Sequence, residues 1–270
     1  MASDSRDRPI AMFDSGFGGL TVARAVIDLL PNENLVYFGD TARYPYGSRR
    51  HEEVASFARQ ITDLLVEQYD PKMIVVACNT ASAVALDDLA AQVEVPVVGV
   101  LRPGLESLLK VTLTSRVGMI GTVGTVASGA YQRLAAEIAP RVDFRCAACP
   151  GFVEFVERGE TGSDQVRVLA QRLLAPLIEA KIDGLLLGCT HYPFLARTIA
   201  EVMGRDVVLV SSADETAFEV RRALEASNDG RTADCQGMHR FVSSGDVTTF
   251  ARLGRDLFGP ELNHVECHNW

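Results

Sequence analysis

The chain has 270 residues, 47% of them hydrophobic, which is enough to bury one large core or two ordinary ones and excludes a disordered polypeptide. Its formal net charge of −9, from 35 acidic and 26 basic side chains, argues against broad binding of nucleic acid or of an anionic membrane surface. The first residues, MASDSRDRP, lack the apolar core of a signal peptide, and no apolar run approaches the ~18 residues of a membrane span. We therefore expect a cytoplasmic protein with no membrane or nucleic-acid partner, whose six cysteines are free thiols.

Short apolar runs alternate with longer helical patterns from the start of the chain to about residue 210. The expected strands are Ile10–Phe13, Leu35–Phe38, Met73–Ala77, Val97–Val100, Val117–Gly121, Val142–Cys146, Gly184–Leu187 and Val207–Val210. The expected helices between them are Leu20–Leu30, Glu52–Tyr69, Ala81–Ala91, Val123–Ile138, Asp164–Ala180 and Phe194–Met203. Most of the strands are apolar on both faces, which is typical of buried parallel strands in βαβ units. The pattern predicts a doubly wound α/β protein.

The segment after residue 211 is expected to return to the first half of the chain and pack on it. It contains a helical pattern over Ala213–Ala226, an edge-strand candidate in HRFVSSG, and a short helix over Val247–Leu257.

The alternation runs twice along the chain. A strand with a Gly-rich turn, IAMFDSGFGG (Ile10–Gly19), corresponds to VGMIGTVGTVAS (Val117–Ser128), and MIVVACNTAS (Met73–Ser82) corresponds to GLLLGCTHYP (Gly184–Pro193). This duplication predicts two similar domains, 1–101 with 211–270 and 102–210. The boundary lies near the proline that follows the fourth strand.

Cys78 and Cys189 occupy matching positions in the two halves, each just after a buried strand and before a helix. Ligands of open α/β sheets bind at the carboxyl ends of the strands, and a helix N-terminus there is expected to lower a thiol pKa towards neutrality. Such a thiol is a competent general acid or base. A buried structural cysteine is the alternative for each alone, but the matched pair favours function. If the halves face each other, one thiol removes a proton from a carbon and the other returns one to its opposite face.

The Gly-rich turn DSGFGG lacks the features that specify a nucleotide. A dinucleotide loop has a third glycine where this chain has Thr21, and a P-loop has a lysine where it has Leu20. Free backbone N–H groups and Asp14 suit a carboxylate or an amino acid, although Asp14 as a helix cap is the alternative. Tyr46, in the RYPYGSR turn, is expected to line the same cleft, and His191 to assist Cys189.

Two cysteine clusters are not assigned a site. Cys146 and Cys149 form a CxxC that matches a redox motif or half a zinc site, but no second CxxC or histidine pair completes four ligands. His264, Cys267 and His268 are attributed to a frayed tail. No metal is expected.

The motifs DSGFGG, RYPYGS, VACNTAS and GCTHYP occur in the same order as in the glutamate racemases, which this chain resembles from residue 10 to about 245. These are cofactor-independent enzymes that supply D-glutamate for bacterial peptidoglycan. The resemblance is closer than that to aspartate racemases. It implies two α/β domains with pseudo-twofold symmetry and an active site between them, where Cys78 and Cys189 exchange protons with Cα of the substrate.

The same resemblance implies further site residues. Those expected to bind glutamate are Asp14, Ser15, Tyr46, Gly47, Asn79, Thr80, Thr190 and His191. Asp14 and His191 would also assist the neighbouring thiols. An acidic assistant falls on Glu157, although Gly151 and Glu154 depart from the family's apolar and proline residues in that segment.

Three alternatives stay open at this point. They are a racemase of aspartate or another acidic amino acid, a non-catalytic carboxylate-binding protein with inert cysteines, and a thiol–disulfide protein that uses Cys146 and Cys149. A homodimer is the default assembly for a protein of this kind.

Overall fold

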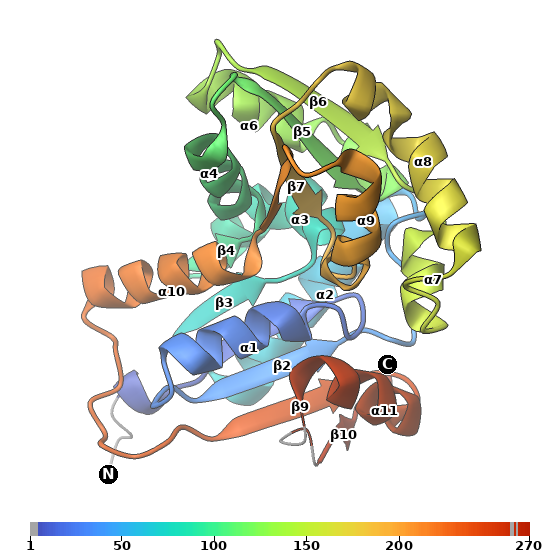
Figure 1. Cartoon of the computed structure of the whole chain (residues 1–270). Helices are drawn as coiled ribbons and strands as arrows, with labels where there is room; N and C mark the ends of the chain where they lie inside the picture. Colours follow the sequence, from blue (N-terminus) through green and yellow to red (C-terminus); the bar gives the residue numbers. More distant parts are fainter. Residues whose placement is uncertain (1–4, 260–261, 263) are drawn as a thin grey trace.

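The protein, described here from a computed structural model, forms two fully parallel sheets joined at their carboxyl ends (Figure 1). The structure describes residues 5–259, 262 and 264–270. The first sheet has the order β10-β9-β2-β1-β3-β4, and the second has the order β6-β5-β7-β8. The strands are β1 (Ile10–Asp14), β2 (Leu35–Gly39), β3 (Met73–Val76), β4 (Val97–Gly99), β5 (Arg116–Gly121), β6 (Asp143–Ala148), β7 (Gly184–Gly188), β8 (Val208–Ser211), β9 (His239–Ser243) and β10 (Glu266–Cys267). The doubly wound α/β architecture is as predicted.

Helices cover both faces of each sheet, which explains why the strands are apolar throughout. The helices are α1 (Leu20–Leu29), α2 (His51–Tyr69), α3 (Asn79–Gln92), α4 (Leu101–Val111), α5 (Val123–Ala127), α6 (Ala130–Ile138), α7 (Phe152–Glu157), α8 (Asp164–Glu179), α9 (Ala196–Met203), α10 (Ala213–Ser227) and α11 (Val247–Phe258), with 3₁₀ turns at Ser5–Asp7 and Tyr192–Leu195. Successive residues of β1 enter different cores: Met12 packs with residues of α1 and α10, and Phe13 with residues of α2 and α3. This alternation follows from the two-residue period of a strand.

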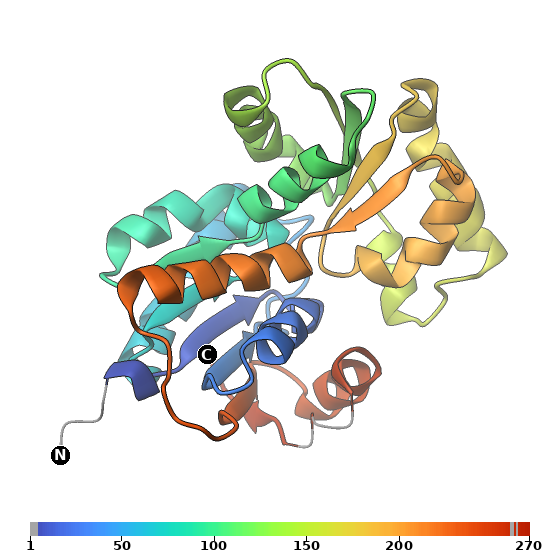
Figure 2. The same ribbon diagram turned by 60° about the vertical axis from the view of Figure 1, so that its left-hand side comes forward.

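The two sheets belong to two lobes that meet where the strands end (Figure 2). β1 and β3 lead into the Gly-rich turn and α3 of one lobe, while β5 and β7 lead into α5 and the Tyr192–Leu195 turn of the other. Helix α3 contacts α5 and α6, and α4 contacts α10, so the lobes are packed against each other on both sides of the strand ends.

The segment after residue 211 returns to the first sheet, as predicted. Helix α10 packs on α1, and β9 pairs with β2 in parallel. β9 is not the edge strand that the sequence suggested, because β10 pairs outside it. The attribution of His264, Cys267 and His268 to a frayed tail is therefore wrong for the last two, which lie in or next to β10.

One helical prediction differs from the structure, and helix α4 was not predicted. The single helix expected over Val123–Ile138 is divided into α5 and α6, because Gly129 adopts a left-handed conformation with φ 69°. Helix α4, which the sequence analysis did not predict, begins directly after β4 and has Pro103 in its first turn. Proline is compatible with the first turn of a helix, since the N–H it lacks has no partner there.

Among the described residues, no helix combines the length and the apolar character that a bilayer crossing requires.

A buried ion pair joins three distant segments of the first lobe. Nζ of Lys72 lies 2.5 Å from the Glu33 carboxylate, and the two side chains are 0% and 7% exposed. The ammonium also donates to the carbonyl oxygens of Arg6 and Asp229, at 2.7 and 2.9 Å. It thereby ties the first 3₁₀ turn and the chain after α10 to the start of β3.

We expect Lys72→Met to lower the free energy of unfolding by about 3 kcal/mol, because the Glu33 carboxylate would stay buried without its partner. Urea unfolding followed by circular dichroism measures this. Arg8→Met is the control: it removes a pair with Asp70 whose side chains are 30% and 81% exposed, so it should cost less than about 1 kcal/mol. Equal losses in the two variants would contradict the assignment.

Candidate active site

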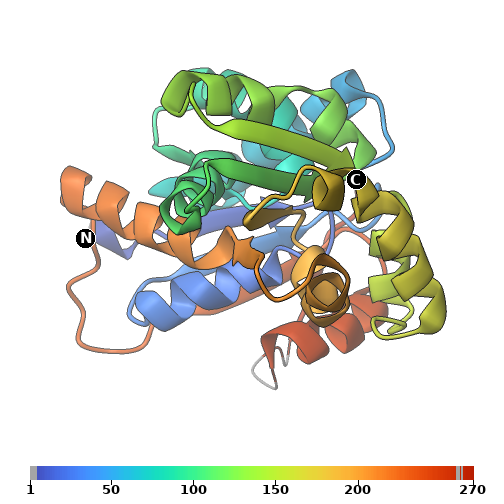
Figure 3. The same cartoon turned by 45° about the horizontal axis from the view of Figure 1, so that its top comes forward.

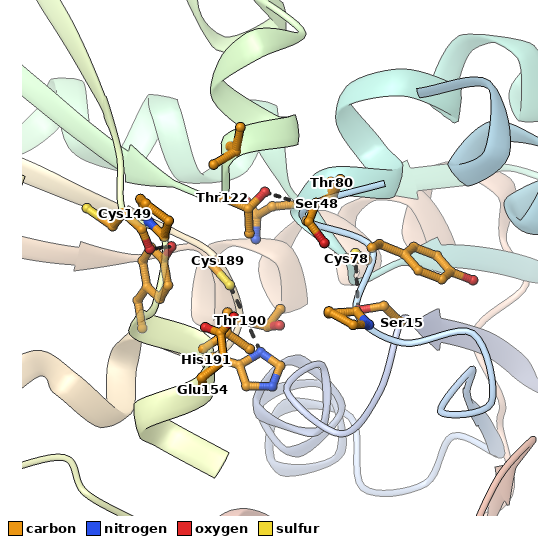
Figure 4. A pocket seen from close by; sticks show the side chains of 18 of the residues that line it. Ser15, Ser48, Cys78, Thr80, Thr122, Cys149, Glu154, Cys189, Thr190 and His191 are labelled. Carbon is orange, nitrogen blue, oxygen red and sulfur yellow. Dashed lines mark hydrogen bonds between the residues drawn. The ribbon is translucent and has the colours of Figure 1, made fainter. Parts of the chain in front are cut away.

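Cys78 and Cys189 line one cavity between the lobes, although they come from different sheets (Figure 4). Cys78 follows β3 and caps α3, and Cys189 follows β7. The cavity is partly open to solvent and, with that open part included, has a free volume of about 640 Å³; the two sulfurs lie on opposite sides of it. Both thiols are free and at least nine-tenths buried. The other predicted residues that line it are Ser15, Tyr46, Gly47, Asn79, Thr80, Thr190 and His191.

Asp14 does not line the cavity but lies behind it, fully buried, between the surroundings of the two thiols. On one side the Cys78 thiol donates to Oγ of Ser15 at 3.8 Å, and Ser15 donates to the Asp14 carboxylate at 3.4 Å. On the other side the Thr190 hydroxyl donates to the second carboxylate oxygen at 3.3 Å. Asp14 therefore connects the strand ends of both lobes.

His191 stands beside Cys189, with Nδ1 4.0 Å from the sulfur. Its ring packs edge-on against Phe17 at a centroid distance of 4.9 Å, and lies 6.0 Å from the ring of Tyr44. Both aromatic residues belong to the first lobe. The imidazole of the second lobe is thus held in place by the first.

Gly18 of DSGFGG permits close packing between the lobes. A Cβ on Gly18 would lie 2.5 Å from Oγ1 of Thr190 and 2.6 Å from Nδ1 of His191. The sequence suggested that the backbone N–H groups of this turn are free for an anion, but the N–H of Gly16 donates to the Asp14 carboxylate at 2.8 Å. Ser15 is the residue of this motif that lines the cavity.

The prediction that the helix N-termini lower the thiol pKa values towards neutrality is wrong for this structure. Burial, together with the charge of Asp14, raises the pKa of Cys78 to about 12. The pKa of Cys189 is also raised, by burial first and then by the Cys78 and Asp14 charges. Backbone N–H groups at both strand ends act in the opposite direction, but the loss of hydration outweighs them.

Burial shifts the pKa values of the two assisting groups in opposite directions. It raises the pKa of Asp14 from 3.8 to about 6, against the hydrogen bonds from Gly16, Thr190 and others that lower it. It lowers the pKa of His191 from 6.5 to about 4. Near pH 7 to 8, Asp14 is therefore a buried carboxylate and His191 a neutral imidazole.

Donors from both lobes surround the remaining wall of the cavity. The Asn79 carboxamide accepts from the Tyr131 hydroxyl at 2.8 Å, which leaves its buried Nδ2 without a partner among the described residues. The hydroxyls of Thr80 and Thr122, from the two lobes, lie 3.0 Å apart. The Thr122 side chain was not singled out in the sequence; its place after β5, matching Ser15 after β1, was the available signal.

Glu157 is not among the residues that line the cavity. It lies in a separate depression with Phe17 and Arg252, on the side of the molecule where α7 and α11 lie next to each other (Figure 3). Its pKa is raised by burial, and its charge also raises the pKa of the Tyr44 phenol. Glu157 therefore reaches the cavity only indirectly, through Tyr44, which is one of the lining residues.

Glu154 and Cys149 are two further lining residues that the sequence did not assign to the site. Cys146, the partner of Cys149 in the CxxC motif, is not among the lining residues. Cys146 and Cys149 are both free, and burial raises the pKa of each to about 12. No group of three or more potential metal ligands is found in the described part of the chain.

Comparison with known proteins identifies relatives over nearly the whole chain. A family model described as Asp/Glu/Hydantoin racemase matches residues 20–219. A glutamate racemase of Acidothermus cellulolyticus is 49% identical over 96% of this chain and 98% of its own. The solved glutamate racemase RacE1 of Bacillus anthracis has a TM-score of 0.91 at 38% identity, and that of Francisella tularensis, solved with D-glutamate, has 0.91 at 31%; each pair is covered over 98% of both chains.

The match to the family model, the identity to curated relatives and the similarity to solved structures lead to one conclusion. The chain belongs to the glutamate racemases of the Asp/Glu/hydantoin racemase family.

Proposed function

We propose that this chain interconverts L- and D-glutamate without a cofactor, with Cys78 and Cys189 as the two acid–base groups. The observation that carries the proposal is the position of both thiols on opposite sides of one buried cavity, at matching strand ends of the two lobes. A planar carbanion held between them is open to a proton from either face. Substrate identity rests on the family, whose members named above are glutamate racemases.

In the proposed reaction, the thiolate of one cysteine takes the Cα proton and becomes a thiol. The electron pair of the C–H bond passes into the substrate carboxylate. The thiol of the other cysteine then gives its proton to the opposite face of Cα and becomes a thiolate. One proton leaves and one returns, so no oxidant or cofactor is consumed. The roles are exchanged when the other enantiomer is the substrate.

Asp14 and His191 are proposed to set which sulfur is charged. The hydrogen bonds from Cys78 through Ser15 to Asp14 offer a route for the Cys78 proton, and neutral His191 can accept that of Cys189. The raised thiol pKa values mean that few thiolates form at neutral pH, but each is a strong base. The substrate ammonium, which Asp14 also attracts, would offset part of the cost of forming a thiolate in this cavity.

The substrate carboxylate needs donors, because it carries the developing negative charge. Nδ2 of Asn79 is a buried donor without a partner in the described chain, and Tyr131 holds its amide in place. The hydroxyls of Thr80 and Thr190, and the residues Tyr46 and Gly47, complete the proposed binding site.

We further propose that the lobes are two domains, 1–101 with 211–270 and 102–210. Each range contains the strands of a single sheet, with Ser211 of β8 at the division; residues 1–4, 260, 261 and 263 lie outside the described residues. A homodimer in the cytoplasm that supplies D-glutamate for peptidoglycan is the setting that the family suggests.

Racemisation assays with both enantiomers of glutamate and aspartate, without added cofactor or metal, test which amino acid is the substrate. A preference for aspartate would contradict the proposal.

Replacement of either thiol by a hydroxyl tests the two-base assignment. We expect Cys78→Ser and Cys189→Ser each to lower kcat by about 10²- to 10⁴-fold, the usual contribution of a general acid or base. In deuterium oxide, each variant should exchange the Cα hydrogen of one enantiomer faster than it inverts it, because one working thiolate remains. Cys146→Ser, outside the cavity, is the control and should racemise normally. Wild-type rates in Cys78→Ser would refute the mechanism.

Asp14→Asn is expected to lose racemisation and to gain stability. The folded-state pKa of Asp14, about 6, lies above its ordinary value of 3.8, so burial of the charge costs nothing below about pH 4 and about 3 kcal/mol above pH 6. Asparagine carries no charge, so the variant should be more stable than wild type at pH 8, and by less at pH 5. Urea unfolding at both pH values measures the difference, and Asp87→Asn, an exposed carboxylate, should show none. A destabilised Asp14→Asn at pH 8 would contradict the assignment.

A further inference from the structure

The loop between β2 and α2, residues 40–50, carries five residues of the cavity wall, Tyr44 to Ser48, and begins at a buried carboxylate. Asp40 is fully buried and accepts four hydrogen bonds. Its donors are the Tyr46 hydroxyl, Nε of Arg43 at 2.7 Å, Oγ of Ser244 at 2.7 Å and Nε1 of Trp270 at 2.8 Å. Two of these donors belong to the loop itself, and two come from the segment after β9.

Trp270 also holds the Arg43 side chain directly. The guanidinium lies 3.6 Å from the centroid of the indole ring and 4.3 Å from that of Phe57 on α2. A guanidinium enclosed by two aromatic faces is stabilised by cation–π interaction and loses freedom to turn away from Asp40. Trp270 thus acts on the Asp40 carboxylate twice, once through its own N–H and once through Arg43.

The position of Trp270 is set by the first sheet rather than by the cavity. β10 pairs with β9, and the N–H of His268 donates to the carbonyl oxygen of Ser243 at 2.9 Å. The indole then packs edge-on against Phe38 of β2 and against His268, at 5.7 and 4.9 Å. The C-terminal segment therefore presents the indole N–H to Asp40 from a fixed sheet edge.

The other end of the loop reaches the second lobe. Tyr46 and Gly47 line the cavity, and the carbonyl oxygen of Gly47 accepts from the N–H of Gly124 at 2.8 Å. A shift of the Tyr46 hydroxyl away from Asp40 would move this wall of the cavity and its contact with α5.

We propose that Trp270 is a positioning residue for the cavity: through Asp40 and Arg43 it holds Tyr46 and Gly47 where the substrate binds. The proposal rests on the racemase function proposed above. Trp270 is 47% exposed and contributes little to the core, so its role is separable from fold stability. It does not touch the cavity and is not itself a catalytic residue.

Two substitutions separate the contributions of the indole. Trp270→Phe keeps an aromatic face for Arg43 but removes the N–H, and Trp270→Ala removes both. Loss of one hydrogen bond to a charged group predicts that Trp270→Phe lowers kcat/KM for glutamate about fivefold, mainly through a higher KM, and that Trp270→Ala lowers it more. The thermal midpoint should fall by about 5 °C or less in either variant, because three other donors still hold Asp40. Phe218→Ala is the matched control, because it removes an exposed ring over Arg221 on α10, away from the cavity, and should leave both constants unchanged.

A double-mutant cycle shows whether Trp270 acts through Tyr46. If it does, Trp270→Phe should change kcat/KM by less than about twofold in a Tyr46→Phe background, since the hydroxyl that it positions is already absent. Effects that simply multiply in the double variant, or a Trp270→Phe enzyme with wild-type kinetics, would overturn the positioning role while leaving racemisation intact.

Trp270 is the single tryptophan of the sequence, which provides a readout that does not depend on turnover. Addition of D-glutamate should change its fluorescence in a saturable way, and the Tyr46→Phe variant should lose this change, because coupling between two sites is reciprocal. A wild-type protein that racemises no glutamate would refute the proposed function alone. In that case a fluorescence titration without a saturable change would also refute the role of Trp270.

Discussion

The cavity depends on one buried carboxylate that both lobes share. Asp14 ends the central strand of the first sheet, and its oxygens accept from Ser15 and Gly16 of its own lobe and from Thr190 of the other. Its raised pKa shows that these donors do not fully replace the lost hydration. A charge retained at such a cost, between two thiols, is typical of a site in which stability is exchanged for function.

The same burial explains the ionisation of the surrounding groups. Removal of water raises the thiol pKa values, holds His191 neutral and strengthens every charge–charge contact inside the cavity. With these raised pKa values, neither thiol is an ordinary nucleophile. In the proposed reaction, the substrate's own charges would have to compensate for those formed on sulfur, which would favour a charged amino acid as the substrate.

Asp14 ends β1 and Asp40 directly follows the neighbouring strand β2, and the surroundings of the two carboxylates differ in a way that explains their different roles. Asp14 lies beside hydroxyls and thiols that can exchange protons with it. Asp40 is saturated by four donors, two of them brought by chain segments about 200 residues away. The first is suited to proton transfer, and the second to holding a loop in place.

The sequence by itself determined the α/β class, the duplicated strand–cysteine pattern and nine of the 20 residues that line the cavity, because parallel strands place the residues after their carboxyl ends at one edge. It also led to the family, through four motifs. Only the tertiary structure decided the thiol pKa values, because the local pattern shows a helix N-terminus but not the depth of burial that outweighs it. Likewise, Asp14 behind the wall, Glu157 beside Tyr44 and Trp270 on Asp40 depend on contacts between distant segments, for which no local pattern in the chain provides a signal.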